Sequence, residues 1–183
     1  MRNITKKNLK VLIIILILLS TASITLVLTE ISAKDSSANL YPTKNLSSDE
    51  HLYITNDDDL AGNSSSGTGE PESPYIIENY DIETTEFYGI YITGTTKDFT
   101  IRNCTTESFS AGIFIDTVAS NTVTIYNNTC NGSGHGIRIS FTTYVNITEN
   151  ICNDNSDGIF LEYSPYAIVT NNTCAYQANG LYV

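Results

Sequence analysis

The residues best suited to chemistry in this sequence are one histidine and a few carboxylates. His135 stands in the run Gly134-His135-Gly136-Ile137-Arg138-Ile139, and Asp154 and Asp157 share one short segment. Carboxylates that flank a glycosidic bond can protonate its oxygen and activate water, and carboxylates with Ca²⁺ and a base can abstract a proton beside a uronate. No second or third aspartate lines up beside His135 on one face, so we expect His135 to be a turn residue and predict no catalytic residue.

A second group of residues is suited to binding. Five similar tetrapeptides each place one large side chain at the same position: Tyr91, Phe114, Arg138, Phe160 and Tyr182. Each lies between two aliphatic residues, so all five point outward if the aliphatic residues point inward on a strand. Stacked aromatic rings with one arginine form a flat surface that fits sugar rings, and outward rings also stabilise neighbouring strands by stacking. The five residues are candidates for a substrate-binding stripe, and mutual stacking without a ligand remains an equally open interpretation.

A repeat of about 22 residues reveals the elements that must position this stripe. A glycine followed by an aliphatic, a variable and another aliphatic residue occurs five times, at Gly89, Gly112, Gly136, Gly158 and Gly180. A second apolar pair begins 13 residues before each of the last four glycines. The extra residues of the longer repeats fall in one loop, which is where a stacked coil tolerates insertions. Each unit therefore has two short alternating segments, which suit strands.

These units cannot bury their apolar sides alone, so they must stack with parallel strands about 4.8 Å apart. The glycine before each second strand suits a positive φ or a close approach between coils. The sequence therefore predicts an all-β fold, a right-handed parallel β-helix of about five coils over residues 75–183. Val183 and Val169 are expected among its inward aliphatic residues, and almost no α-helix is expected beyond the hydrophobic export helix described below.

Residues 75–183 resemble the parallel β-helix repeats of the pectin-lyase-like superfamily, and more narrowly the right-handed β-helix region of NosD-like proteins. The segment 67–78 is similar to the one that commonly leads into such helices. The run 134–139 resembles fragments of polygalacturonase signatures, but the Asp-Asp element of that family is missing. The resemblance implies the fold and no single activity, because such proteins include lyases, hydrolases, epimerases and non-catalytic surface proteins.

Aligning the repeats on their glycines places asparagines and cysteines in two columns. The first column holds Asn128, Asn150 and Asn172, with Cys104 as its odd member, and the second holds Cys130, Cys152 and Cys174. For the asparagines we predict a ladder of hydrogen-bonded amides at a turn. We expect the cysteines to face inward as small apolar side chains, with one disulfide or a soft-metal site as alternatives.

The N-terminal segment has the pattern of an export signal. Four basic residues precede an apolar run of 19 residues from Val11 to Thr29, which is also just long enough to span a bilayer. We assign residues 1–33 to a signal peptide or a membrane anchor and residues 34–74 to an irregular lead-in or linker. The acidic run 57–59 within that linker is interpreted as a solvated loop rather than a metal site. The predicted location is secreted or on the extracellular face of the cell membrane.

The charge restricts the partners. The chain of 183 residues has a net charge of −11, and residues 34–183 alone carry −14. Such a surface repels nucleic acid and anionic lipid headgroups, so membrane contact is expected only through the N-terminal segment. No cofactor or metal is predicted, and the expected partner is a polysaccharide or a cell-surface glycan. Two functions remain open: a non-catalytic carbohydrate-binding, adhesion or structural module, and a polysaccharide lyase or glycoside hydrolase whose active residues lie partly outside this chain.

Two further expectations concern modification and the last repeat. In an exported chain, Asn-x-Ser/Thr sequons are glycosylation candidates, and three of them lie near predicted turns: Asn127, Asn131 and Asn171. The last repeat reaches Val183 directly after an apolar, uncharged strand. Because an uncapped strand edge templates pairing with other chains, we expect either a longer β-helix or end-to-end self-association.

Overall fold

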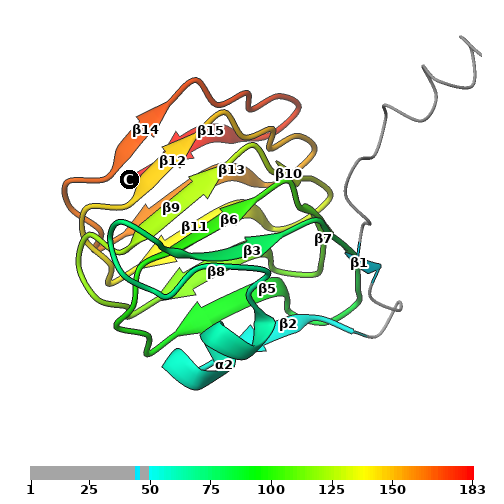
Figure 1. The fold of residues 1–183 in the computed structure, drawn as a ribbon. Coiled ribbons are helices and arrows are strands. Elements are labelled where there is room, and N and C mark those ends of the chain that lie inside the picture. The colour runs from blue at the N-terminus through cyan, green and yellow to red at the C-terminus, as the bar shows by residue number, and fades with distance from the viewer. Residues whose placement is uncertain (1–43, 46–49) are drawn as a thin grey trace, which may run out of the picture. The chain divides into compact units, whose positions relative to one another are not determined.

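The structure is a computed structural model that describes residues 44–45 and 50–183. The predicted export segment 1–33 lies outside these residues. Three sheets wind around one core (Figure 1). Among the described residues, no helix is long and apolar enough to cross a membrane.

The strands of each sheet come from successive coils. The six-stranded sheet contains β2 (Leu52–Ile54), β5 (Tyr88–Thr93), β8 (Ala111–Asp116), β11 (His135–Ser140), β13 (Asp157–Glu162) and β15 (Asn179–Tyr182). The five-stranded sheet contains β3 (Tyr75–Glu78), β6 (Phe99–Arg102), β9 (Val123–Tyr126), β12 (Asn146–Thr148) and β14 (Ile168–Thr170). The four-stranded sheet contains β1 (Lys44–Asn45), β4 (Tyr80–Glu83), β7 (Thr105–Glu107) and β10 (Thr129–Cys130).

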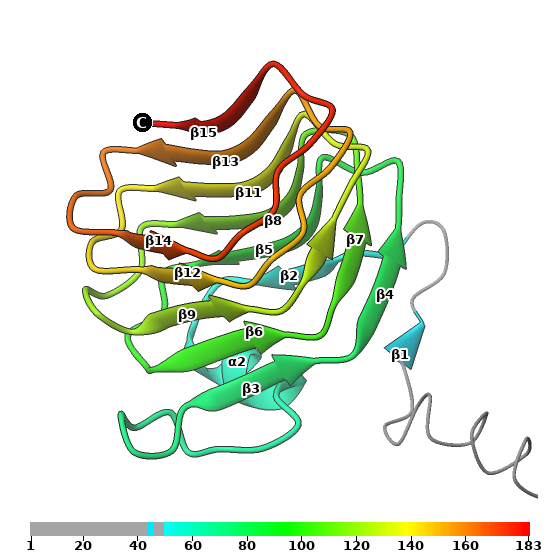
Figure 2. The ribbon, with the colours of Figure 1, turned by 90° about the horizontal axis from the view of Figure 1, so that it is seen from above.

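Every strand pairs in parallel with its equivalent in the next coil, as a parallel β-helix requires. The five-stranded sheet has one strand from each of five successive coils, so the chain makes about four turns between β3 and β14. Figure 2 shows this stack beside the stack that runs from β2 to β15. The predicted all-β solenoid with almost no helix is confirmed.

The core consists of aliphatic columns from the inward faces of the strands. In the six-stranded sheet, two neighbouring columns are formed by Ile90, Ile113, Ile137 and Ile159 and by Ile92, Ile115, Ile139 and Leu161, all of them buried. Val183 was expected in this core, but it is exposed, because among the described residues no strand lies on β15.

The repeated glycines are required by close approach rather than by a left-handed backbone. Gly112 and Gly136 are not among the described residues with positive φ. A Cβ atom on Gly136 would lie 2.7 Å from the carbonyl oxygen of Gly158 in the next coil, and one on Gly112 would lie 2.9 Å from that of Gly136. A side chain at these positions would therefore push neighbouring coils apart.

The expectation of an irregular segment over 34–74 is wrong for its second half. Leu52 and Ile54 in β2 are buried and extend the six-stranded sheet below β5. Residues 57–63 form a helix, α2 (Asp57–Asn63), whose Leu60 is fully buried in the same core. The solenoid therefore begins before residue 75, and α2 lies at its β2 end (Figures 1 and 2).

The acidic run 57–59 is the first turn of α2 and not a loop. The side chain of Asn56 accepts a hydrogen bond from the amide of Asp59 (2.9 Å), which makes Asn56 the N-cap. Asp57 accepts from the amide and the hydroxyl of Thr96 (2.7 and 2.6 Å), which fixes the helix to a loop of the first coil. Three carboxylates suit this position because the N-terminal end of a helix is electropositive.

Thr117 allows a test of whether left-handed backbone at the turns is strained. Its φ of 51° is left-handed, which is costly for a β-branched residue, and the equivalent position one coil earlier is Gly94 with φ 64°. Thr117→Gly should raise the free energy of unfolding by about 0.5–1 kcal/mol, because relief of strain exceeds the entropic cost of glycine. Thr105→Gly, at an exposed position in β7, should instead lower it by about 1 kcal/mol. Urea denaturation measures both, and a loss in both variants would contradict the strain argument.

Candidate functional site

The outer face of the six-stranded sheet carries a column of large side chains. The strand register places one such residue in each coil, and together they form what we call the aromatic column: Tyr53, Tyr91, Phe114, Arg138, Phe160 and Tyr182. Their neighbours along each strand point into the core, so alternation turns these side chains outward. The five residues predicted from the sequence are all brought together, and β2 adds Tyr53 as a sixth.

The rings of the aromatic column contact one another along the axis. Ring centroids are 4.8 Å apart for Tyr53 and Tyr91, 5.2 Å for Tyr91 and Phe114, and 5.1 Å for Phe160 and Tyr182. The guanidinium carbon of Arg138 lies 4.7 Å from the Phe114 centroid and 5.7 Å from that of Phe160. These distances suit aromatic stacking and cation–π attraction. The arginine therefore joins two aromatic segments into one continuous row.

Phe114 does not contribute the accessible surface that the sequence predicted. It is only 6% exposed, because Tyr88 (5.0 Å), Tyr91 and Arg138 cover its ring. Phe114 therefore stabilises its neighbours by stacking, which is the alternative role considered for these side chains. Tyr91, Arg138 and Phe160 are half-buried, and Tyr182 is half-exposed.

Arg138 is held in place by a carboxylate. Its Nη2 atom donates to Oε2 of Glu162 at 2.9 Å, and the hydroxyl of Ser140 donates to the same oxygen at 3.1 Å. These two hydrogen bonds, with Arg138 the larger cause, lower the pKa of Glu162 below its usual value. This ion pair holds the guanidinium between the Phe114 and Phe160 rings, and it leaves the arginine little unpaired charge for an anionic ligand.

His135 has a carboxylate partner, contrary to the expectation that no second aspartate lies beside it. It is the first residue of β11 rather than a turn residue, and its Nδ1 atom lies 3.2 Å from Oδ2 of Asp157 in the next coil. Asn179 donates to the other oxygen of Asp157 at 2.6 Å. Burial is the largest influence on His135 and lowers its pKa, while the nearby Asp157 carboxylate acts in the opposite direction. Its ring centroid lies 4.7 Å from that of Phe160, which places the histidine beside the aromatic column.

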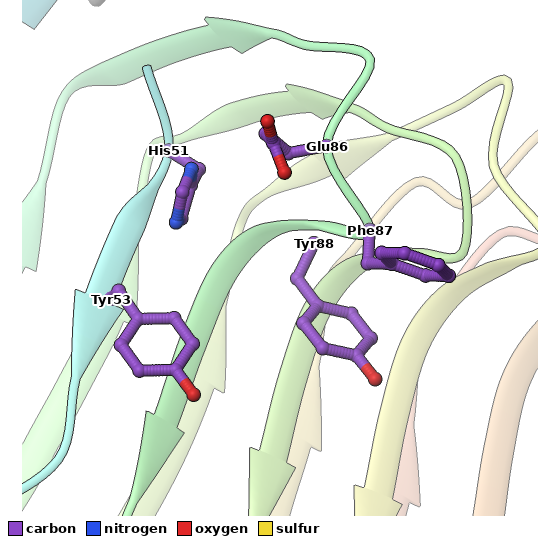
Figure 3. A pocket seen from close by; sticks show the side chains of 5 residues that line it. All are labelled: His51, Tyr53, Glu86, Phe87 and Tyr88. Atoms are coloured by element: carbon purple, nitrogen blue, oxygen red, sulfur yellow. The ribbon is translucent and has the colours of Figure 1, made fainter. Parts of the chain in front are cut away.

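A hollow of about 350 Å³ opens at the β2 end of the aromatic column. It is lined by His51, Tyr53, Glu86, Phe87 and Tyr88, and Figure 3 shows the imidazole and the carboxylate at one end with the two tyrosine rings at the other. The Tyr88 ring lies 5.2 Å from that of Tyr91, so the hollow continues into the column. This combination of apolar ring faces and polar groups suits a ligand that has both apolar faces and hydroxyl groups.

The family comparison agrees with this architecture. A family model described as "Right handed beta helix region" matches residues 45–183, which is most of the chain. The chain belongs to the right-handed β-helix family. The predicted handedness is thereby confirmed, and the match begins near β1 rather than at residue 75, as the structure does. Searches of curated proteins and of solved structures gave no significant match.

The asparagine ladder of this right-handed β-helix is confirmed. Nδ2 of Asn128 donates to Oδ1 of Asn150 at 3.0 Å, and Nδ2 of Asn150 donates to Oδ1 of Asn172 at 2.9 Å. Each Oδ1 also accepts the backbone N–H of the residue in the previous coil, including that of Cys104. The ladder closes the turn between the five-stranded and four-stranded sheets and fixes the coil register on which the aromatic column depends.

The cysteines of this β-helix are free thiols, as the first of the three interpretations expected. Cys104, Cys130 and Cys152 are buried, and Cys174 is half-buried. Over residues 44–45 and 50–183, no three His, Cys, Asp or Glu residues are grouped so that they could hold a metal ion. The disulfide alternative is absent from this structure.

The three glycosylation candidates lie at turns, as expected. Asn127 and Asn171 are exposed, and both have a left-handed backbone with φ of 52° and 57°. Nδ2 of Asn127 donates to Oδ1 of Asn103 at 2.8 Å, so a glycan there would replace that bond. Asn131 is half-buried, and its Oδ1 accepts the amide of Asn153 at 2.8 Å. Exposure therefore favours Asn127 and Asn171 over Asn131, and their modification stays a prediction.

Proposed function

We propose that this β-helix is a non-catalytic module that binds a neutral polysaccharide along the outer face of the six-stranded sheet. The observation that supports this most strongly is the continuous row from the hollow at Tyr53 and Tyr88 to Tyr182. Sugar rings have apolar faces that pack against aromatic rings, while their hydroxyls need hydrogen-bonding partners at the edges. The row offers both, because polar residues stand on either side of it.

The polar side columns support hydrogen bonding to hydroxyls. On one side Asp116 and Glu162 stand beside the column, and Asp116 accepts a hydrogen bond from the Tyr91 hydroxyl at 3.4 Å. On the other side, His135 and Asp157 occupy the positions equivalent to Tyr88. Carboxylates and imidazoles accept hydrogen bonds from sugar hydroxyls on both edges of a bound chain.

The charge balance favours a neutral ligand over a polyuronate. Lys97, Arg102 and Arg138 each lie within 2.9 Å of a glutamate, so their charges are already paired. The strands of this face place Asp116, Asp157 and Glu162 beside Arg138, and Glu86 borders the hollow. Residues 34–183 have a net charge of −14. A polyanion bound on this face would have to overcome this field, and the arginine of the aromatic column is already paired with Glu162.

A non-catalytic role is supported by how the candidate groups are engaged. Hydrolysis of a glycoside commonly uses two carboxylates on opposite sides of the bond, and proton abstraction beside a uronate needs a cation for its carboxylate. Here Asp157 lies against His135 and Asn179, while Glu162 holds Arg138. The export pattern of residues 1–33 supports a location at the cell surface, where such a module would meet glycans.

Removing the two tyrosine rings of the hollow tests the proposal. Tyr53→Ala with Tyr88→Ala should weaken binding of a neutral oligosaccharide such as cellohexaose about tenfold or more, which corresponds to at least about 1.4 kcal/mol. Isothermal titration calorimetry measures the affinity. The control Tyr126→Ala removes an exposed ring from β9, outside this face, and should bind like the unmodified protein.

Two outcomes would contradict the proposed function. The first is tighter binding of polygalacturonate than of the neutral oligosaccharide, which would overturn the charge argument. The second is the appearance of new reducing ends or of unsaturated sugar products after incubation, which would make the module an enzyme. In that case His135→Ala should abolish product formation, because its imidazole lies beside the aromatic column and against the Asp157 carboxylate.

A further inference from the structure

The outer face of the five-stranded sheet has a hollow of its own. It has a volume of about 310 Å³ and is bordered by Pro71 and Pro74 on the loop before β3 and by Tyr144 on the loop before β12. Its floor is the outward column of four successive strands, which the register assigns to Thr100, Thr124, Asn146 and Ile168. It lies on a different sheet from the aromatic column and shares no residue with it.

Two tyrosines stand beside this second hollow as a stacked pair. Tyr144 and Tyr166 come from equivalent positions of successive coils, and their ring centroids are 4.7 Å apart with an angle of 17° between the planes. They are 50% and 68% exposed, so their outer surfaces are open to solvent. The pair forms an aromatic wall beside the floor, and Tyr144 is the member that lines the hollow.

The backbone at both tyrosines is strained. Tyr144 and Tyr166 have φ of 58° and 63°, and the same column begins one coil earlier with Asn121 at 63°. Asparagine adopts this left-handed conformation readily, whereas for a large aromatic residue it is an outlier. The fold imposes this left-handed turn in successive coils, and tyrosine in place of asparagine at such a turn is a cost that points to a use for the rings.

The floor and rim of the second hollow determine which ligand fits. Thr124 and Asn146 are half-buried and present a hydroxyl and an amide, and Asp98 adds a carboxylate. No lysine or arginine lines the hollow, which disfavours an anionic ligand. β9 and β12 are each paired on both sides, so an extended peptide cannot add to the sheet here. Sugar rings have many hydroxyls and apolar faces, so they can form hydrogen bonds with the floor and pack against the two tyrosines.

We propose that this face is a second glycan site, which takes a neutral oligosaccharide with one sugar ring against Tyr144 and Tyr166 and its hydroxyls on Thr124, Asn146 and Asp98. The ligand class is the one assigned to the aromatic column, but the residues are separate, so either site can fail alone. Two sites on different sheets allow one module to hold two glycan chains. The module then cross-links polysaccharide rather than only coating it.

The substitution that tests this site also relieves its strain. Tyr144→Asn with Tyr166→Asn removes both rings and installs the residue that Asn121 already carries in the same column. The variant should fold at least as stably as the unmodified protein. Tyr176→Asn is the matched control, because Tyr176 is an exposed tyrosine with φ of 61° outside both hollows.

Calorimetry with cellohexaose should give two sites for the unmodified protein and for Tyr176→Asn. The Tyr144→Asn/Tyr166→Asn variant should retain one site, with the affinity for the other reduced at least tenfold, and Tyr53→Ala/Tyr88→Ala should retain the complementary one. A single site that only Tyr53→Ala/Tyr88→Ala removes would overturn this inference and leave the proposed function intact. A single site that only Tyr144→Asn/Tyr166→Asn removes would support this second site and overturn the site proposed on the aromatic column. No binding of cellohexaose at all would overturn both sites.

Discussion

Asn150→Ala should lower the free energy of unfolding by about 3 kcal/mol, the largest effect expected of a single polar substitution here. The Asn150 side chain is fully buried, and its amide donates to the carbonyl oxygens of Ile125 and Thr148, both at 3.0 Å. Its Oδ1 atom accepts the backbone and side-chain N–H groups of Asn128 at 2.9 and 3.0 Å. Alanine leaves these buried groups without partners, and each costs about 1–3 kcal/mol.

The control for this prediction lies one coil away in the same turn. Asn127 is exposed, and the one hydrogen bond that its side chain donates, to Asn103, is also exposed. Asn127 also has a left-handed φ of 52°, which glycine adopts without strain, so Asn127→Gly removes only this exposed bond and should change the free energy of unfolding by less than about 0.5 kcal/mol. Urea denaturation with the thiols kept reduced measures both variants. A loss below about 1 kcal/mol for Asn150→Ala would mean that the ladder does not hold the coils in register.

The second large effect concerns the thiols. In the folded protein at pH 8, Cys174 should react with iodoacetamide about a hundredfold faster than the other three cysteines, because only the thiolate is nucleophilic. Burial raises the pKa of Cys104 to about 12, and hydrogen bonds with Cys130 and Cys174 are the main cause of the raised pKa of Cys152. Cys174 is half-buried and accepts a hydrogen bond from Cys152, which lowers its pKa.

Mass spectrometry of digested, time-sampled protein measures this order. Cys174→Ser should remove the fast reaction, and in urea all four thiols of the unmodified protein should react at similar rates. The rate at Cys104 should keep rising with pH until about pH 12, since its folded-state pKa is raised and most of the thiol stays protonated below that pH. Equal labelling of Cys104 and Cys174 at pH 8 would contradict the assigned burial.

The repeat made most of the fold predictable. Glycines about 22 residues apart, with aliphatic residues at fixed offsets, predict stacked parallel strands, because no other arrangement buries every apolar side. The same register predicted the ladder at Asn150 and the outward position of Tyr91 and Phe160, all of which the structure shows. These features depend only on the period of the chain, which can be counted in the sequence.

Features outside the repeat could not be predicted in this way. β2 has three residues between polar segments, too few for periodicity to reveal a strand, so Tyr53 and the hollow beside it were missed. The acidic run of α2 resembled a solvated loop, because a helix of seven residues has too little apolar pattern to be recognised. Asn56 as an N-cap before Asp57 was the one local signal for it.

The environment of individual side chains was harder to predict than their column. His135 and Asp157 each stand directly before a repeat glycine, but their pairing depends on both side chains turning to the outer face, which only the structure shows. Phe114 is buried because Tyr88, at the bend of the preceding coil, lies over it. Such contacts depend on rotamers and on the bend between sheets, and neither is encoded in the repeat period.

The most direct test of the central claim is to observe the tyrosine rings while a neutral oligosaccharide binds. The chain has 12 tyrosines and no tryptophan, so ring-labelled tyrosine gives a resolvable set of NMR signals. On titration with cellohexaose, the signals of Tyr53, Tyr88 and Tyr91 should shift together along one saturating curve, while that of Tyr176 stays fixed. Glycan binding on the six-stranded sheet would be contradicted if other tyrosine signals shifted to saturation while those of Tyr53 and Tyr88 did not move. It would also be contradicted if no tyrosine signal shifted.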